Sequence, residues 1–291
     1  MRMDPFGRTQ YRRRPAHRRR SGLLRLVPIL LFSLFLAYYW FSHHEVVPMT
    51  GRKQLVDLTR EEEMRLGYQS YQQVLAQENV LRNGKIVEEV RTIGRRLAKA
   101  AADVDPGFEW EFNVIESPQA NAFALPGGKV AVYTGILDIA KNENGLSAVM
   151  GHEIAHAIAR HGAERMAYQK LIQWGTMAAA IALGDMSYNT QRMVQGALGL
   201  GSKYGVLLPF SRSHESEADY MGLIFTARAC YDPREAPNLW ERMAEQSKGS
   251  PEEFLSTHPS HETRIKQLNQ WMPEALKIYE ENCDDDLATV E

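Results

Sequence analysis

Apolar residues recur every three or four positions along three stretches of the chain, as they do on one face of a helix. The stretches are Thr59–Gln77, Arg82–Ala102 and Asn142–Gly162, the last reading "NENGLSAVMGHEIAHAIARHG". This spacing predicts three helices, of which the first two are amphipathic. Asn142 or Asn144 is a suitable N-cap for the third helix, because an asparagine side chain accepts a hydrogen bond from a backbone N–H of the first turn.

A β-hairpin is predicted before the third helix. In "NAFALPGGKVAVYTG" two apolar runs flank Pro126, Gly127 and Gly128, which form a turn signal, and the second run, Lys129–Tyr133, is rich in valine. A similar run, Trp110–Ile115, predicts another strand of the same sheet. Together these patterns predict an α+β fold that is mainly α-helical and contains a small β-sheet.

Charge is distributed unevenly along the chain, although the net charge is only −2. The first 25 residues contain nine arginines against Asp4, a charge of +8, whereas the remaining 25 basic and 35 acidic side chains give −10. The basic segment is followed by Leu26–Phe41, sixteen uncharged residues that end in aromatic side chains. Because about 20 apolar residues cross a bilayer, and aromatic residues favour its interface, this stretch predicts a transmembrane signal anchor.

The segment after the predicted anchor contains no small-residue cleavage pattern, which favours an uncleaved anchor over a cleaved signal peptide. An arginine-rich tail could also bind nucleic acid, but the apolar stretch favours a membrane, and we expect no nucleic-acid partner. The predicted organisation is a basic cytoplasmic tail (1–22), the anchor (23–42), a linker (43–57), one large domain (58–283) and an acidic tail (284–291).

The third predicted helix carries His152, Glu153 and His156 in the pattern H-E-x-x-H. Residues four apart share one face of a helix, so both imidazole rings can reach the same metal ion. Glu153 lies about 100° round the helix, from where its carboxylate can reach a metal-bound water without binding the metal. The alternative, two histidines satisfied within the core, is costly on a largely apolar helix. The pattern therefore predicts a catalytic zinc site.

A catalytic zinc site needs a third protein ligand. The metzincin extension of the pattern would require glycine and histidine where this chain has Ala159 and Gly162, which excludes that class. His161 lies about 140° round a continuous helix from His156, so we expect it at the surface or at the C-terminal dipole of the helix, and not among the ligands.

The stretch "SRSHESEADYMGLIFTARAC", Ser211–Cys230, predicts a further helix with Ser213 as its N-cap. Glu215 and Asp219 are four residues apart and therefore share a face. They offer one carboxylate for the metal and one to accept the ring N–H of a ligating histidine. Glu217 points elsewhere, either to solvent or to an arginine.

The chain resembles the zinc metallopeptidase family that includes the CAAX prenyl endopeptidases, HtpX and BepA. It is most similar to the stress-activated metalloendopeptidase of the mitochondrial inner membrane and its bacterial relatives. The resemblance lies in "LPGGKVAVYTGILDIAKN", "GHEIAHAIARHGAER", "ESEADYMGLIFTARAC" and "LSTHPSHETRIKQLNQWMPEALKIYEENC". It implies a zincin domain of the gluzincin type over residues 58–283, in which His152, His156 and Glu215 hold one Zn²⁺ and Asp219 supports a ligand.

The family and the H-E-x-x-H pattern imply a membrane-anchored zinc metalloendopeptidase that hydrolyses peptide bonds in membrane-associated or misfolded envelope proteins, for protein quality control. In that mechanism Glu153 takes a proton from the zinc-bound water and then protonates the leaving amine. The expected partners are protein or peptide substrates and a membrane, and a homo-oligomer stays open. The rival hypothesis is a chaperone-like or assembly factor with a structural metal site.

Zincins commonly hold a peptide as an added strand beside the active-site helix. The predicted substrate-binding strand comprises Lys129, Val130, Ala131, Val132 and Tyr133. A purely structural hairpin would have the same sequence.

The resemblance further implies that His258, in "STHPSHETR", faces the zinc and that Arg264 lies nearby, and both are predicted as catalytic. A neutral His258 could occupy the open zinc position and hold the enzyme latent. Alternatively, a protonated His258 could stabilise the oxyanion together with Arg264. Simple packing beside Pro259 is the third interpretation.

The nine arginines before the anchor place the N-terminus in the cytoplasm and the large domain across the membrane. We therefore expect a single-pass protein of the bacterial inner membrane with a periplasmic catalytic domain. The arginine-rich, acid-poor start leaves the mitochondrial inner membrane, facing the intermembrane space, as the alternative. The two cysteines, Cys230 and Cys283, lie on that side, and either a disulfide or two buried thiols are compatible with the sequence.

Overall fold

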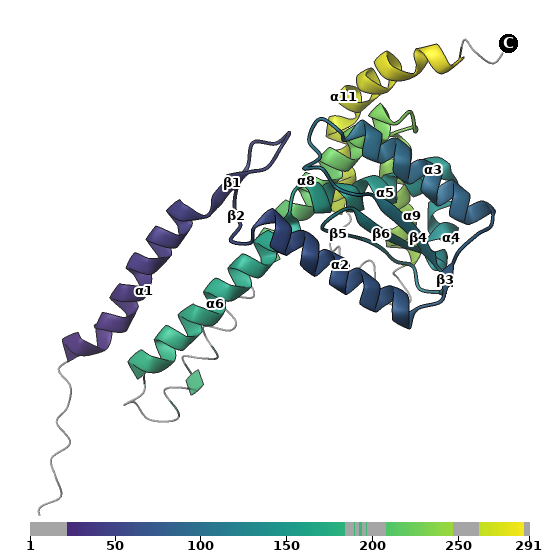
Figure 1. Cartoon of the computed structure of the whole chain (residues 1–291). Helices are drawn as coiled ribbons and strands as arrows, with labels where there is room; N and C mark the ends of the chain where they lie inside the picture. Colours follow the sequence, from purple (N-terminus) through teal and green to yellow (C-terminus); the bar gives the residue numbers. More distant parts are fainter. Residues whose placement is uncertain are drawn as a thin grey trace, which may run out of the picture.

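The computed structural model describes residues 22–183, 189, 192–193, 196, 208–246 and 262–287. In Figure 1 most of them form a rounded body built around a small sheet, and two long helices, α1 and α6, project from it side by side. Helix α1 spans Gly22–Ser42 and α6 spans His161–Leu183. The two are joined by packing between aromatic rings, such as those of Phe35 and Trp174, whose centroids are 5.4 Å apart.

The body contains a four-stranded sheet in the order β3-β4-β6-β5. Its strands are β3 (Val80–Leu81), β4 (Glu111–Ile115), β5 (Ala122–Leu125) and β6 (Lys129–Tyr133). Strands β4 and β6 run parallel, and the other pairs are antiparallel. Gly127 and Gly128 have φ angles of 86° and 81°, which glycine adopts without steric cost, and they form the predicted turn between β5 and β6.

Helices surround this sheet, and a separate two-stranded hairpin connects α1 to it. The hairpin consists of β1 (His44–Val46) and β2 (Lys53–Leu55). The helices of the body are α2 (Arg60–Gln77), α3 (Lys85–Ala100), α4 (Leu137–Ala140), α5 (Glu143–Ile158), α8 (Leu208–Arg228), α9 (Glu235–Gln246) and α11 (Glu262–Leu287). The predicted mainly α-helical architecture with a small sheet is confirmed, as are the predicted helices α2, α3 and α5.

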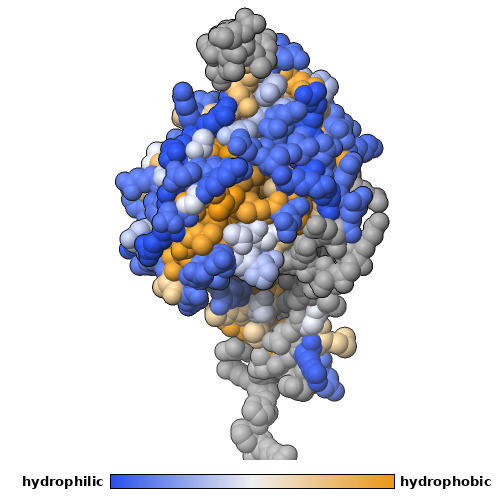
Figure 2. Space-filling view, turned by 90° about the vertical axis from the view of Figure 1, so that its right-hand side faces the viewer, coloured by the Kyte–Doolittle hydropathy of each residue, from blue (hydrophilic) through white to orange (hydrophobic). Residues whose placement is uncertain are grey.

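Helix α5 forms the centre of the core. Nearly every residue from Gly145 to Ile158 is buried, because the helix packs against α3, α8, α9 and strand β5. Asn142 caps its first turn, since the side-chain oxygen accepts a hydrogen bond of 2.9 Å from Gly145 N. Hydrophilic residues cover most of the face of the body seen in Figure 2, around a central group of hydrophobic ones.

Two glycines allow α5 and α8 to approach closely. A Cβ atom on Gly222 of α8 would lie 2.8 Å from the backbone nitrogen of His152 and 2.9 Å from the carbonyl carbon of Gly151. Only residues without a side chain permit this contact between two backbones. The close approach places the acidic residues of α8 beside the histidines of α5.

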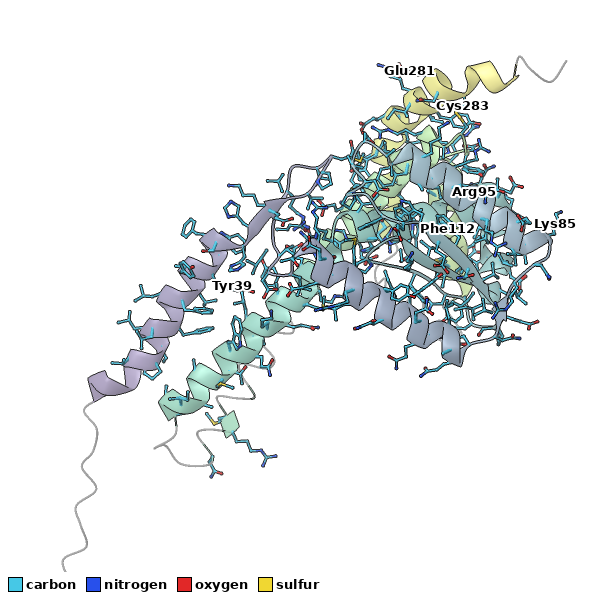
Figure 3. The ribbon with its side chains drawn as sticks, viewed as in Figure 1. Tyr39, Lys85, Arg95, Phe112, Glu281 and Cys283 are labelled. Carbon is cyan, nitrogen blue, oxygen red and sulfur yellow. A yellow bond between two sulfur atoms is a disulfide. The ribbon has the colours of Figure 1, made fainter. Side chains whose placement is uncertain are left out.

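A disulfide between Cys230 and Cys283 fixes the end of α8 to α11. Cys283 is labelled on α11 in Figure 3. The bond joins residues 53 positions apart in the sequence. Of the two alternatives that the sequence allowed, the structure therefore contains the disulfide.

The predicted anchor is helical, since α1 covers it, but the described helices do not support a membrane span. None of them combines the length and the apolar character that crossing a bilayer requires.

Substitution of Gly222 by alanine tests the contact between α5 and α8. We expect Gly222→Ala to lower the free energy of unfolding by about 1–3 kcal/mol, because the added methyl group meets backbone atoms that cannot turn aside. Urea denaturation measures this loss. Gly162→Ala in α6 is the control, since a Cβ there meets no atom within 4 Å. Equal stability of both variants would contradict the proposed contact.

Candidate active site

Three predicted ligands converge between α5 and α8. His152 Nε2 lies 3.0 Å from His156 Nε2 and 3.4 Å from Glu215 Oε2, and His156 Nε2 lies 3.6 Å from Glu215 Oε1. Ligand atoms about 2.0–2.1 Å from a tetrahedral metal are separated by about 3.3 Å, so the three side chains fit one metal ion. Two imidazole nitrogens and one carboxylate oxygen are also a donor set that catalytic zinc sites use.

Glu153 lies beside this group and is 4% exposed. Its side chain lines a cavity of about 210 Å³ together with His156 and Glu215. Ala124, Leu125 and the following Pro126 also line this cavity. The predicted general base is therefore in the same cavity as two of the metal-binding residues.

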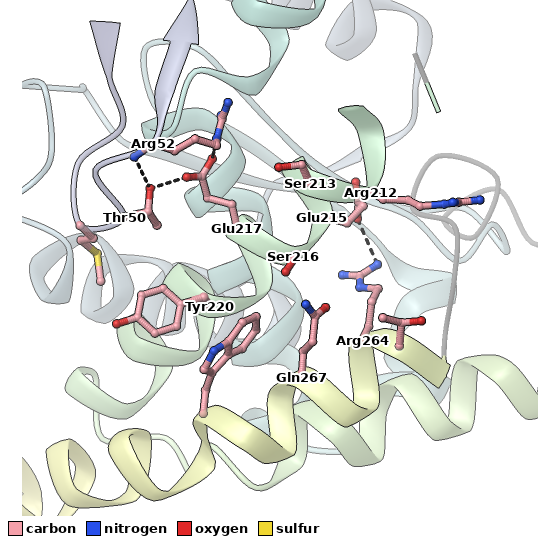
Figure 4. A pocket seen from close by; sticks show the side chains of 13 residues that line it. Thr50, Arg52, Arg212, Ser213, Glu215, Ser216, Glu217, Tyr220, Arg264 and Gln267 are labelled. Carbon is pink, nitrogen blue, oxygen red and sulfur yellow. Dashed lines mark hydrogen bonds and ion pairs between the residues drawn. The ribbon is translucent and has the colours of Figure 1, made fainter. Parts of the chain in front are cut away.

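Asp219 and Arg264 contact the predicted metal ligands through hydrogen bonds and ion pairs. Asp219 Oδ1 is 3.0 Å from His152 Nδ1. Arg264, which is 2% exposed, donates two hydrogen bonds of 2.6 Å to the carboxylate of Asp219, and its third nitrogen lies 3.0 Å from Glu215 Oε2 (Figure 4). Burial alone would raise the pKa of Asp219, but the charge and hydrogen bonds of Arg264 keep it below its usual value.

These contacts change the interpretation of Arg264. The sequence suggested that it stabilises an oxyanion together with His258. In the structure its guanidinium group is stacked 3.4 Å above the ring of Trp240 and is bonded to Asp219 and Glu215. This arrangement favours a role in holding the metal-binding residues. His258 lies outside the described residues.

His161 does not lie at the surface, so that alternative of the prediction is wrong, although His161 is not among the three converging side chains. The residue is 4% exposed, and its Nδ1 is 2.8 Å from Nδ1 of His156. Helix α5 ends at Ile158, Arg160 adopts a φ of 60°, and α6 starts at His161 in a new direction. The angle calculated for one continuous helix therefore does not apply.

The segment predicted as a linker contributes to the site. Arg52, from the loop between β1 and β2, forms ion pairs of 2.8 Å with Glu164 of α6 and Glu217 of α8. Glu217 thus pairs with an arginine, one of the two predicted alternatives. His214 Nε2 is 2.8 Å from Glu164 Oε2, and its ring stacks on that of His161 with 4.1 Å between centroids. Neither hydrophobic spacing nor a motif indicates these contacts.

The strand predicted to bind substrate is not at the edge of the sheet. Strand β6, Lys129–Tyr133, pairs with β4 on one side and with β5 on the other, so its backbone groups are already bonded within the sheet. The edge beside the metal-binding residues is β5, Ala122–Leu125, the first arm of the same hairpin. The β5–β6 hairpin was predicted correctly, but the prediction placed β6, and not β5, at the edge of the sheet.

The fold and the site define a metallopeptidase of the H-E-x-x-H class. The chain belongs to peptidase family M48, whose model matches residues 86–272. It is 39% identical over 240 residues to the mitochondrial metalloendopeptidase OMA1 of Schizosaccharomyces pombe, covering 81% of this chain and 69% of the relative. These likenesses confirm the family and show that the chain is a metalloendopeptidase.

Two relatives of lower sequence identity are matched over a smaller fraction of their own length. The human metalloendopeptidase OMA1 is 35% identical over 271 residues, which are 87% of this chain and 50% of the human protein. The β-barrel assembly-enhancing protease of Escherichia coli is 27% identical over 246 residues, 81% of this chain and 50% of that protein. The chain thus spans about half the length of these two relatives.

The buried histidines beside the site have shifted pKa values. Burial lowers the pKa of His161 well below its ordinary value. It also lowers the pKa of His214, although the hydrogen bond to Glu164 opposes this shift. For His152, burial and Arg264 favour the neutral ring, but the hydrogen bonds to Asp219 and Glu215 outweigh them and raise the pKa to about 9.

These shifts predict that the metal-free protein loses stability as the pH falls from 6 to 5. The unfolded chain takes up protons with a pKa of about 6.5, whereas the lowered pKa values of His161 and His214 make the folded protein take up fewer protons in this window. Each of them removes up to about 1.4 kcal/mol of stability per pH unit. His152 adds little in this window, because its raised pKa keeps it protonated in the folded protein and a pH below 6.5 leaves it mostly protonated in the unfolded chain as well.

Urea denaturation at pH 6 and pH 5, with a chelator present, measures this loss. Replacement of His214 by phenylalanine should make the free energy of unfolding less dependent on pH. Replacement of the exposed His44 by glutamine is the control and should leave the dependence unchanged. A free energy of unfolding that is the same at both pH values would show that the two buried histidines are not held neutral.

Proposed function

We propose that this metalloendopeptidase is zinc-dependent and membrane-associated, and that it hydrolyses peptide bonds in membrane-associated or misfolded proteins as part of protein quality control. The observation that carries the proposal is the convergence of His152, His156 and Glu215 within distances that suit one tetrahedral ion. Bound zinc would supply Lewis acidity for a water molecule and for the peptide carbonyl.

In this proposal Glu153 moves the proton. Its carboxylate accepts a proton from the attacking water as the new C–O bond forms, and it delivers that proton to the amide nitrogen as the C–N bond breaks. Asp219 orients the ring of His152 by accepting from its Nδ1. Arg264 acts as a positioning residue, since it bonds to both Asp219 and Glu215.

The edge strand β5 is the proposed binding site for the substrate backbone. An extended peptide added antiparallel to Ala122–Leu125 would lie along the cavity that contains Glu153 and His156. Main-chain hydrogen bonds to an edge strand do not depend on the side chains of the peptide. This mode suits an enzyme that acts on misfolded proteins of varied sequence.

Three observations support the membrane and the compartment. Helix α1 exposes Leu30, Leu31, Leu34 and Phe41, each at least 60% accessible, and such apolar side chains favour contact with lipid. The fungal and mammalian relatives are named as mitochondrial, which matches the mitochondrial alternative. The Cys230–Cys283 disulfide suits an oxidising compartment. The bacterial single-pass topology receives no support from the described helices.

Replacement of Glu153 by glutamine tests the mechanism. We expect Glu153→Gln to bind one zinc ion per chain and to cleave casein about 10²–10⁴ times more slowly, because glutamine cannot accept the proton. Glu143→Gln is the matched control, since Glu143 lies exposed in the first turn of the same helix. A Glu153→Gln protein that retains zinc and full activity would contradict the proposed role.

A further inference from the structure

The two metal-binding histidines are supported in different ways. His152 Nδ1 lies 3.0 Å from the carboxylate of Asp219, so that an acceptor is in direct contact with the ring. His156 Nδ1 instead faces another imidazole, that of His161, with 2.8 Å between the two nitrogens. An imidazole can accept or donate, and therefore this second contact supports metal binding only if the proton lies on the correct nitrogen.

Glu217 determines where that proton lies. His161 Nε2 is 2.9 Å from Glu217 Oε2, and because a carboxylate only accepts, Nε2 of His161 must donate. In a neutral His161 ring the other nitrogen, Nδ1, is then an acceptor. His156 accordingly donates from Nδ1 and carries its lone pair on Nε2, the nitrogen that faces His152 and Glu215.

The loop between β1 and β2 holds Glu217 in this position. Arg52 Nε donates a hydrogen bond of 2.8 Å to Glu217 Oε2, and Thr50 Oγ1 donates to Glu217 Oε1. Figure 4 shows Thr50 and Arg52 on either side of this carboxylate. The other end of the Arg52 guanidinium group donates bonds of 3.0 and 2.8 Å to Glu164, which anchors the loop on α6 as well.

We propose that Glu217 and His161 are positioning residues for His156 and that Thr50 and Arg52 keep them in place, so that the tip of the β1–β2 hairpin is part of the metal centre. The proposal rests on the proposed function in that it assumes a zinc ion at this site. Residues that orient a metal-binding histidine typically contribute 10- to 100-fold in metal affinity. Because the hairpin directly follows α1, a movement of α1 that withdraws Arg52 would weaken the hold on one zinc ligand.

Zinc affinity of the full chain, measured by competition with a chelating indicator, tests the proposal. We expect His161→Phe to raise the zinc Kd by about 10- to 100-fold, because phenylalanine keeps the stacking on His214 but offers no acceptor. Arg52→Met should raise the Kd by about tenfold. Arg52→Lys, which keeps the positive charge, should restore part of the affinity. The absorption spectrum of the Co²⁺-loaded variants should change in the same order.

A matched control separates positioning from a general loss of stability. Arg228→Met breaks an ion pair of 2.9 Å with Asp103 at the far end of α8, on the helix that carries Glu217. It should leave both the zinc Kd and the Co²⁺ spectrum unchanged. Should His161→Phe fail to fold, Arg52→Met gives the same test, since Arg52 lies in a loop and its side chain is 25% exposed.

The outcomes distinguish this proposal from the proposed function. If wild-type protein binds one zinc ion and cleaves casein while His161→Phe and Arg52→Met keep the wild-type Kd and Co²⁺ spectrum, the positioning proposal alone is wrong. It is also wrong if Arg228→Met weakens zinc binding to the same extent. If the wild-type protein binds no zinc, the proposed function fails and this inference fails with it.

Discussion

The backbone contact between α5 and α8 sets the geometry on which the site depends. The proposed metal-binding group takes two residues from one helix and one from the other, and its atoms must lie within a few ångströms of a common point. Ordinary side chains at the crossing would keep the helix axes 8–10 Å apart. Gly151 and Gly222 remove that obstacle at the turn that carries His152. The chemistry of the site is therefore determined partly by residues that have no side chain.

The close packing of α5 and α8 buries many charged groups. The second condition for the fold is that these buried charges are offset by ion pairs and hydrogen bonds. Glu164, Glu215, Glu217, Asp219 and Arg264 are all less than 9% exposed. An isolated buried charge is very costly, and the cost is offset only by good geometry and complete hydrogen bonding. Arg264 and Arg52 meet this need from opposite sides, one from α11 and the other from the β1–β2 loop. Elements distant in the sequence are thus required at one site.

Local patterns in the sequence account for much of this structure. The spacing of His152 and His156, and that of Glu215 and Asp219, predicts which of these residues share a helix face. The assignment of Glu215 as the third ligand came from the resemblance to the family. The β5–β6 turn is equally local, because Gly127 and Gly128 adopt φ angles that few other residues tolerate.

Other features depend on tertiary contacts that a sequence pattern does not contain. Which arm of the hairpin is the edge strand depends on the pairing of β6 with β4. The place of His161 depends on the chain reversal at Arg160, a residue with φ of 60° that is held by Glu45 and Glu63. The contacts of Arg52 form only because the β1–β2 hairpin folds back onto α6 and α8. Composition alone did not distinguish this hairpin from a linker.

Anomalous X-ray scattering at the zinc absorption edge, from crystals of the metal-loaded full chain, tests the central claim most directly. The account predicts one strong peak per chain, about 2.0–2.1 Å from Nε2 of His152, Nε2 of His156 and a carboxylate oxygen of Glu215. A zinc-loaded crystal with no peak between these three residues, or with its only peak elsewhere, would contradict the account.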